Sequence, residues 1–206
     1  MQQYIAFLRG MNLGSRRVKM DRLRRLFEEM DFAAVATFIA SGNVIFESQI
    51  EDAAEIENQI QNHLERALGY RVDAFVRSRT QVATIASSQP FSKVEMNNQA
   101  YTVNVSFFKS PLAPEVARKL KKFRTDVDAF NVEGREFFWL CRIKMRESTV
   151  WALPEIRALK FPTSSMRNIT TLRKLAKTYS PRIDPVPSLR AQQPAAKSSL
   201  RIKPPH

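Results

Sequence analysis

Apolar and polar positions alternate along the chain with periods that predict short strands and helices in a repeating order. The apolar run Tyr4–Leu8, bounded by Gly10, predicts a buried strand. Apolar side chains at helical spacing follow over Met20–Met30. The turn residues Ser41, Gly42 and Asn43 then predict a hairpin. The other elements expected in this half are the strands Val35–Ala40 and Val44–Glu47, the helix Glu51–Leu68, the strand Val72–Val76 and the helix Thr80–Ser88.

The second half repeats this order of elements. It is expected to contain the strand Tyr101–Phe108, the helix Pro114–Phe123, the strands Asp126–Val132 and Arg135–Leu140, the helix Glu147–Leu159, the strand Lys160–Thr163 and the helix Asn168–Tyr179. Pro154 lies inside the expected helix Glu147–Leu159 and conflicts with an uninterrupted helix there. The order is that of a ferredoxin-like split βαβ unit. The pattern therefore predicts an α+β fold: two ferredoxin-like βαββαβ-type halves in tandem, with antiparallel sheets and helices packed on one face. We find no residue-level repeat, so the duplication rests on element order.

Three segments follow from this pattern. Residues 1–90 form the N-terminal half and residues 91–180 the C-terminal half. Residues 181–206 are rich in Pro and basic side chains with little to bury, so we expect a flexible tail.

Charge separates the two ends of the chain. The 206 residues carry a formal net charge of +13, but residues 1–140 hold 19 basic and 17 acidic side chains, whereas residues 141–206 hold 14 basic and 3 acidic. A basic segment on a nearly neutral body favours an anionic partner, either a small molecule or nucleic acid. Nucleic-acid binding would need these charges to converge beside exposed aromatic rings. The aromatic run at 137–139 is more typical of a core strand.

A single Cys and two His leave few catalytic or metal-binding options, so we assign no catalytic residue, no metal and no cofactor. Cys141 favours a buried thiol, and His63 a partly exposed helix position. The N-terminus lacks the features of a signal peptide, and no apolar run approaches the ~20 residues of a membrane span. We therefore expect a cytoplasmic protein without membrane insertion. The oligomeric state is open.

The loop Arg9–Lys19 is the most informative stretch for binding. Gly10 and Gly14 allow backbone amides to turn toward a ligand, and the helix that follows favours negative charge at its start. Arg9, Arg16, Arg17 and Lys19 would supply charge-assisted contacts to a phosphate or carboxylate. The spacing matches neither a Walker A loop nor a dinucleotide fingerprint. A solvated basic loop, with glycines serving only the turn, is the competing interpretation.

Three motifs resemble the family called domain of unknown function 1697. They are the strand and loop Tyr4–Gly14, the segment Ser41–Phe46, and Arg167-Asn168 before a Thr- and Leu-containing helix. Members often carry a Gly- and Ser-containing segment before the final helices, whereas Cys141–Ser148 is basic and has no Gly. The resemblance implies an α+β protein with ferredoxin-like halves, bacterial and cytoplasmic. It implies no activity.

The sequence thus favours a binding protein for an anionic ligand or a nucleic-acid backbone, held by the Arg9–Lys19 loop and the basic C-terminal third. One alternative is an enzyme acting on a small phosphorylated or carboxylated metabolite, for which a general base is missing. Another is a non-catalytic scaffold or self-associating module. The candidate ligand-binding residues are Arg9, Gly10, Asn12, Gly14, Arg16, Arg17, Lys19, Ser41, Asn43, Arg167 and Asn168.

Overall fold

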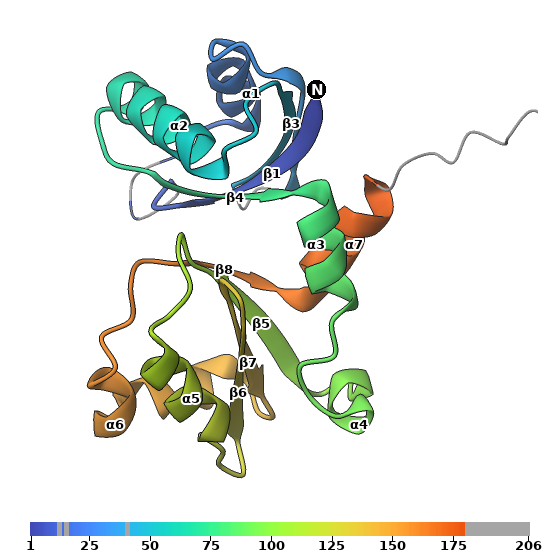
Figure 1. The fold of residues 1–206 in the computed structure, drawn as a ribbon, viewed down its shortest axis with the longest axis vertical. Coiled ribbons are helices and arrows are strands. Elements are labelled where there is room, and N and C mark those ends of the chain that lie inside the picture. Colours follow the sequence, from blue (N-terminus) through green and yellow to red (C-terminus); the bar gives the residue numbers. More distant parts are fainter. Residues whose placement is uncertain (12–13, 15–16, 40–41, 180–206) are drawn as a thin grey trace, which may run out of the picture.

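The computed structural model describes residues 1–11, 14, 17–39 and 42–179. Within them, two four-stranded antiparallel sheets pack face to face, and helices cover the outer face of each sheet (Figure 1). The protein is α+β, with two ferredoxin-like halves in tandem.

The two sheets share one topology. The first has the strand order β2-β3-β1-β4 and the second the matching order β6-β7-β5-β8. Each order follows from a split βαβ unit, in which the third strand inserts between the first and the second. The strands are β1 (Gln2–Arg9), β2 (Ala33–Phe38), β3 (Asn43–Ser48), β4 (Asp73–Ser78), β5 (Thr102–Phe107), β6 (Asp128–Glu133), β7 (Glu136–Cys141) and β8 (Ser165–Asn168).

The helices form an outer layer on each sheet and a bridge between the sheets. α1 and α2 pack on the first sheet, α5 and α6 on the second, and α3 packs against α7 at one end of the space between the sheets (Figure 1). The helices are α1 (Met20–Glu28), α2 (Ala53–Leu68), α3 (Arg79–Ser87), α4 (Lys93–Asn97), α5 (Pro114–Lys122), α6 (Pro154–Arg157) and α7 (Ile169–Thr178).

Most elements lie where the hydrophobic pattern places them, but the stretch before the last helix does not. The helix expected over Glu147–Leu159 is wrong: two 3-10 turns, Met145–Glu147 and Val150–Ala152, precede the four-residue α6, which begins at Pro154. Proline has no amide hydrogen to donate, so it starts a helix there instead of continuing one. The strand expected over Lys160–Thr163 is also wrong, since β8 begins at Ser165.

Two other features differ from the pattern or go beyond it. The short helix α4 has no counterpart among the expected elements; a capping box between Ser92 and Glu95 starts it.

The division of the chain into two halves at residue 90 stays a prediction. The tail from residue 181 lies outside the described residues.

A layer of apolar side chains joins the two sheets. The rings of Phe7 on β1 and Phe107 on β5 stack with centroids 4.0 Å apart and planes 4° apart. Both side chains are fully buried, and the surrounding cluster draws residues from both sheets and from α3 and α7. Burial of such rings contributes a large apolar area. The inner faces of the sheets therefore form one shared core.

Two arginines cross this interface in opposite directions. Arg77 on β4 lies over the ring of Phe107, and its Nη2 donates to the Phe108 carbonyl oxygen at 2.7 Å. Arg167 on β8 lies over the ring of Phe7, and its Nη2 donates to the Leu8 carbonyl oxygen at 2.9 Å. Each arginine thus reaches the central strand of the other sheet.

The partners of the two arginines are also equivalent in register. Phe7 pairs with Asn43 on β3, and Phe107 pairs with Glu136 on β7. Accordingly, the Nε of Arg167 donates to Asn43 Oδ1, and the Nε of Arg77 donates to Glu136 Oε1, both at 2.6 Å. The duplication, visible in the sequence only as element order, extends to individual contacts. The two sets of contacts differ in one acceptor: Arg167 donates to the amide of Asn43, whereas Arg77 donates to the carboxylate of Glu136.

Side chains of α2 protect the open edge of the first sheet. Glu57 accepts a hydrogen bond from the Val76 amide at 2.8 Å, and Gln61 accepts one from the Ala74 amide at 3.3 Å. An edge strand with free amides invites pairing with another chain. These contacts remove two such donors from β4, and Glu57 is 2% exposed.

Burial raises the pKa of the Glu57 carboxyl, and the Val76 amide and nearby cations offset this only in part. The folded protein therefore holds this proton more tightly than the unfolded chain does. The carboxyl's contribution to stability is complete below the ordinary pKa of 4.5 and is lost as the pH rises through the folded-state pKa.

Glu57→Gln keeps an acceptor for the Val76 amide and removes the charge. We expect the variant to be more stable than the parent at about pH 7 and equal to it at about pH 3, as measured by urea unfolding. Glu65→Gln, an exposed change on the same helix, serves as the control and leaves stability unchanged at both pH values. Equal stability of Glu57→Gln and its parent at neutral pH would contradict this account.

Candidate functional site

Arg167 ties together three segments that lie far apart in the sequence. Besides Asn43 and Leu8, its guanidinium donates to the Gly42 carbonyl oxygen at 3.4 Å and to Ser165 Oγ at 2.9 Å. Ser165 Oγ in turn donates to the Leu8 carbonyl oxygen at 3.2 Å. The strand β1, the start of β3 and β8 therefore meet at one guanidinium, although up to 159 positions separate them in sequence.

Burial lowers the pKa of Arg167 to about 10, so the side chain still carries its charge at neutral pH. Carbonyl oxygens and the Asn43 amide oxygen solvate that charge in place of water. Asn43 is itself fully buried, and its Nδ2 donates to the Phe38 carbonyl oxygen at 3.2 Å. In the described structure, Arg167 and Asn43 fasten the halves to each other.

Asn168 has a local partner as well. Its Oδ1 accepts from the Thr170 amide at 2.8 Å and from the Thr170 hydroxyl at 2.7 Å, so it caps the start of α7. The motif Arg167-Asn168 therefore places an interface arginine beside a helix cap.

The described residues of the Arg9–Lys19 loop divide between core and solvent: Met11 and Val18 are buried in the core of the first half, whereas Arg9 and Gly14 are exposed. Arg9 Nη1 lies 3.6 Å from Asp73 Oδ2, and 54% of the Arg9 side chain is exposed. Gly10 and Gly14 both have positive φ, a backbone conformation that glycine adopts more readily than other residues. Arg17 and Lys19 are exposed. The candidates Asn12, Arg16 and Ser41 lie outside the described residues.

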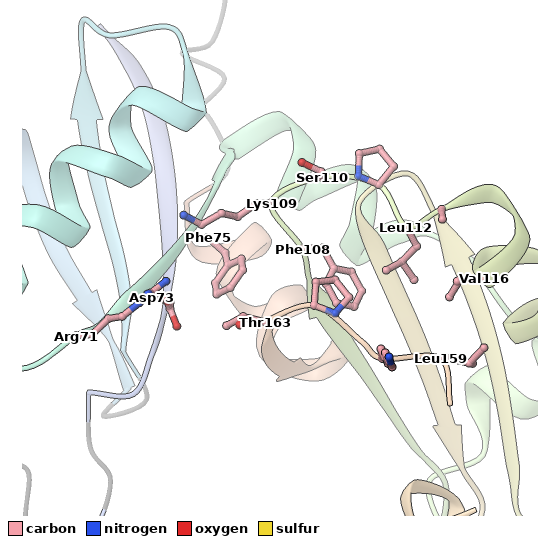
Figure 2. Close-up of a pocket in the computed structure, with 14 residues that line it drawn as sticks. Arg71, Asp73, Phe75, Phe108, Lys109, Ser110, Leu112, Val116, Leu159 and Thr163 are labelled. Carbon is pink, nitrogen blue, oxygen red and sulfur yellow. Dashed lines mark hydrogen bonds and ion pairs between the residues drawn. The ribbon is translucent and has the colours of Figure 1, made fainter. Parts of the chain in front are cut away.

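Next to Arg9 and Asp73, a cavity of about 480 Å³ opens between the two halves. This volume is in the usual range for small-molecule sites. Its walls come from the start of β4, the segment after β5 and the segment before β8 (Figure 2). The lining residues are Arg71, Asp73, Phe75, Phe108, Lys109, Ser110, Pro111, Leu112, Ala113, Val116, Leu159, Lys160, Pro162 and Thr163.

The cavity has ends of different chemistry. Figure 2 shows Arg71, Asp73 and Lys109 toward one end, and Leu112, Val116 and Leu159 toward the other. Arg71 Nε lies 3.0 Å from Asp73 Oδ1, so this carboxylate offsets part of the positive charge. Lys160 adds a third cation to the lining. The cavity can accept an anionic group beside an apolar body.

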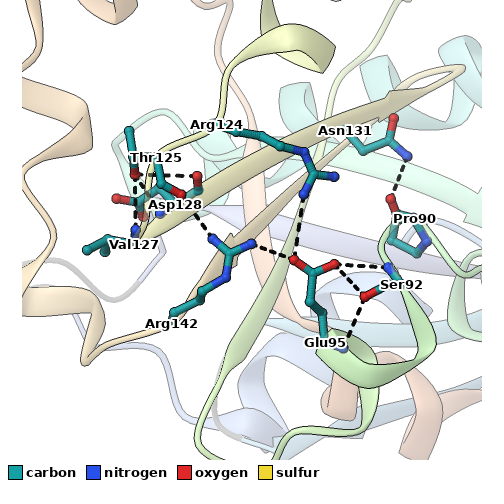
Figure 3. Close-up of polar contacts among 9 residues, drawn as sticks. All are labelled: Pro90, Ser92, Glu95, Arg124, Thr125, Val127, Asp128, Asn131 and Arg142. Carbon is teal, nitrogen blue, oxygen red and sulfur yellow. Dashed lines mark hydrogen bonds and ion pairs between the residues drawn. The ribbon is translucent and has the colours of Figure 1, made fainter.

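A few arginines make contacts within the fold, although most described basic side chains after residue 140 are exposed. Arg142 and Arg124 both contact the Glu95 carboxylate, which joins α4 to the second sheet (Figure 3). Desolvation opposes the charged form of Glu95, but hydrogen bonds from Ser92 and Arg142 outweigh it and lower the pKa of this carboxyl. Arg173 Nε donates to the Ala86 carbonyl oxygen at 3.4 Å. These side chains hold elements together.

The sequence did not predict the cations of the cavity as site residues, because they are far apart in the chain. Arg71, Lys109 and Lys160 stand in three separate segments, so no motif unites them. One signal was available: Lys109 directly follows the expected strand Tyr101–Phe108, just as Arg9 directly follows the expected strand Tyr4–Leu8. Equivalent loops of a duplicated fold are a reasonable place to look for paired cations.

The described residues give little support for a catalytic nucleophile or a metal site. Cys141 is fully buried, and burial raises the pKa of its thiol. His63 Nε2 lies 3.0 Å from Glu29 Oε2, at a helix surface away from the cavity. The described part of the chain holds no group of three His, Cys, Asp or Glu side chains able to bind a metal. Nor does any helix within it have the length and apolarity to span a membrane.

Comparison with known proteins agrees with this architecture. A solved structure described as a conserved bacterial protein, SP0830 from Streptococcus pneumoniae, has the same fold. Its TM-score is 0.66 at 16% identity, over 86% of this chain and 98% of that one. The model of the family "Protein of unknown function (DUF1697)" matches residues 1–138, and the chain belongs to that family. No curated protein matches it.

We expect Arg167→Lys to destabilise the protein by about 2–3 kcal/mol, because one ammonium cannot serve the separate acceptors that the guanidinium reaches. Urea unfolding measures the change. Arg173→Lys, which alters an arginine with a single long hydrogen bond, is the control and costs within about 0.5 kcal/mol. Equal effects of the two substitutions would refute the role given to Arg167.

Proposed function

We propose that the protein binds a small amphipathic anion in the cavity between its two halves. The supporting observation is the polarised lining, with cations near one end and aliphatic side chains at the other. A ligand's anionic group would lie near Arg71 and Lys109, and its apolar body would lie toward Leu112 and Val116. Phe75 and Phe108, both buried, offer flat apolar surface between these ends.

The Arg9–Lys19 loop contributes to this proposal through Arg9. Its guanidinium shares the Asp73 carboxylate with Arg71, so Asp73 orients two arginines at the charged end. Asp73 is 8% exposed, and a buried carboxylate between two cations is well suited to fix their positions. A ligand bound there would face the start of the loop from which the sequence predicted anion binding.

A small ligand suits this site better than a nucleic-acid backbone does. A strand of nucleic acid needs an extended basic groove, usually with exposed aromatic rings. The cavity is compact, and the described contacts of Arg124, Arg142 and Arg173 are made within the protein. We therefore propose a small ligand and treat nucleic-acid binding as the alternative that the experiment below can favour.

The test is calorimetric titration with three anions and their neutral counterparts: phenyl phosphate with phenol, octanoate with octanol, and adenosine monophosphate with adenosine. We expect at least one anion to bind with Kd below about 1 mM and its neutral partner to bind about tenfold more weakly. Affinity falls as the salt concentration rises, because the cations lie at an exposed rim.

Two variants locate the site. Lys109→Met removes a cation of the lining and weakens the anion about tenfold, whereas Lys93→Met, on the distant α4, leaves it unchanged. Ala113→Trp adds bulk to an exposed position of the wall and also weakens binding. Failure of all three anions to bind, or binding that Lys109→Met and Ala113→Trp do not alter, would refute the proposal. Tight, salt-sensitive binding of single-stranded RNA would instead favour the nucleic-acid alternative.

A further inference from the structure

Lys160 adopts a backbone conformation that side chains disfavour. Its φ is +47°, in the left-handed region, and its amide donates to the Arg157 carbonyl oxygen at 3.4 Å, just after α6 ends. This position after a helix commonly holds glycine, because a Cβ crowds the backbone there. Its side chain is exposed and lines the cavity between the halves.

The chain uses glycine at other positions of this kind. Each of its five glycines has a positive φ. Within the described residues, four other residues share the left-handed region: Asp31, Ala34, Ile39 and Lys160. Of these, only Lys160 lines the cavity. A lysine side chain is also too long to hydrogen-bond to its own backbone as Asn or Asp does, so its strain has no such local compensation.

We propose that Lys160 is retained for its ammonium group, which selects a doubly charged ligand. This inference rests on the proposed function and names the ligand class. Arg71, Lys109 and Lys160 approach one cavity from three segments, and Asp73 is the acidic residue of its lining. The lining therefore carries a net charge of +2, which matches a phosphate monoester better than a carboxylate. Lys160 supplies the additional positive charge by which the site prefers a phosphate monoester to a carboxylate.

The substitution Lys160→Gly separates the strain from the charge. Glycine relieves the left-handed strain, so we expect the midpoint of thermal unfolding to rise by about 2–4 °C. The same change removes the ammonium, so the affinity for phenyl phosphate falls about tenfold, while that for benzoate falls less than about threefold. A merely structural lysine would not give higher stability together with lost selectivity.

Asp31→Gly is the matched control, because Asp31 also has a left-handed φ, +62°, just after a helix, and does not line the cavity. It raises the unfolding midpoint by less, because Asp tolerates the left-handed region better than Lys does, and it leaves both affinities unchanged. Lys160→Gln keeps the strain, removes the charge and loses the preference for phenyl phosphate. Lys160→Arg keeps the charge and the preference. Calorimetric titration and differential scanning calorimetry supply the readouts.

The outcomes distinguish this inference from the proposed function. If the parent binds none of phenyl phosphate, benzoate, octanoate and adenosine monophosphate, both fail. If the parent prefers phenyl phosphate and Lys160→Gly keeps that preference, the cavity binds anions but Lys160 does not select them, and only this inference is overturned. An unfolding midpoint that does not rise in Lys160→Gly, while rising in Asp31→Gly, would also overturn it, because no strain would then need explanation.

Discussion

The structure depends on the contact between two sheets that each have only one face covered by their own helices. Stacking of Phe7 on Phe107 fills the centre of that contact, and Arg77 and Arg167 close it from opposite sides. Each arginine satisfies carbonyl oxygens at the end of the other sheet's central strand. Apolar packing alone would let the two sheets slide over each other, whereas the directional hydrogen bonds of the arginines fix one arrangement of the sheets. The cavity owes its shape to this fixed arrangement, since its walls come from both halves.

Repetition of a fold unit does not make the two halves chemically equal. Glu136 pairs with Arg77 as a carboxylate, but the equivalent position beside Arg167 holds the neutral Asn43. Likewise, the sixteen-residue α2 covers the edge of β4, while the corresponding stretch of the second half contains two 3-10 turns and the four-residue α6. That shortened stretch supplies Leu159 and Lys160 to the cavity wall. The departure from symmetry thus helps to create the candidate site.

The hydrophobic pattern predicted most of the fold, because the helices bury one regular face and most strands, covered on both faces, form short apolar runs. It failed between Glu147 and Ser165, where Pro154 and a left-handed Lys160 interrupt regular structure. For the site, the sequence motifs predicted that Asn43 and Arg167 bind a ligand, and this stays a prediction; the structure brings these two side chains together with the Leu8 and Gly42 carbonyl oxygens. Their burial could not be predicted, because it depends on how the two halves dock. The cavity cations were missed for the same reason: Arg71, Lys109 and Lys160 come to line one cavity only through tertiary packing.

The reach of Arg167 across 159 positions also orders events during synthesis of the chain. The N-terminal half emerges with the Asn43 side chain and the Leu8 and Gly42 carbonyl oxygens, and the guanidinium that contacts all three is encoded near the other end of the described residues. Docking of the halves is consequently a late, long-range step, and long-range closure is slow compared with local folding. Until then the inner face around Phe7 is exposed to other chains and to chaperones. The contacts of Arg167 therefore form only when nearly all of the described chain has been made.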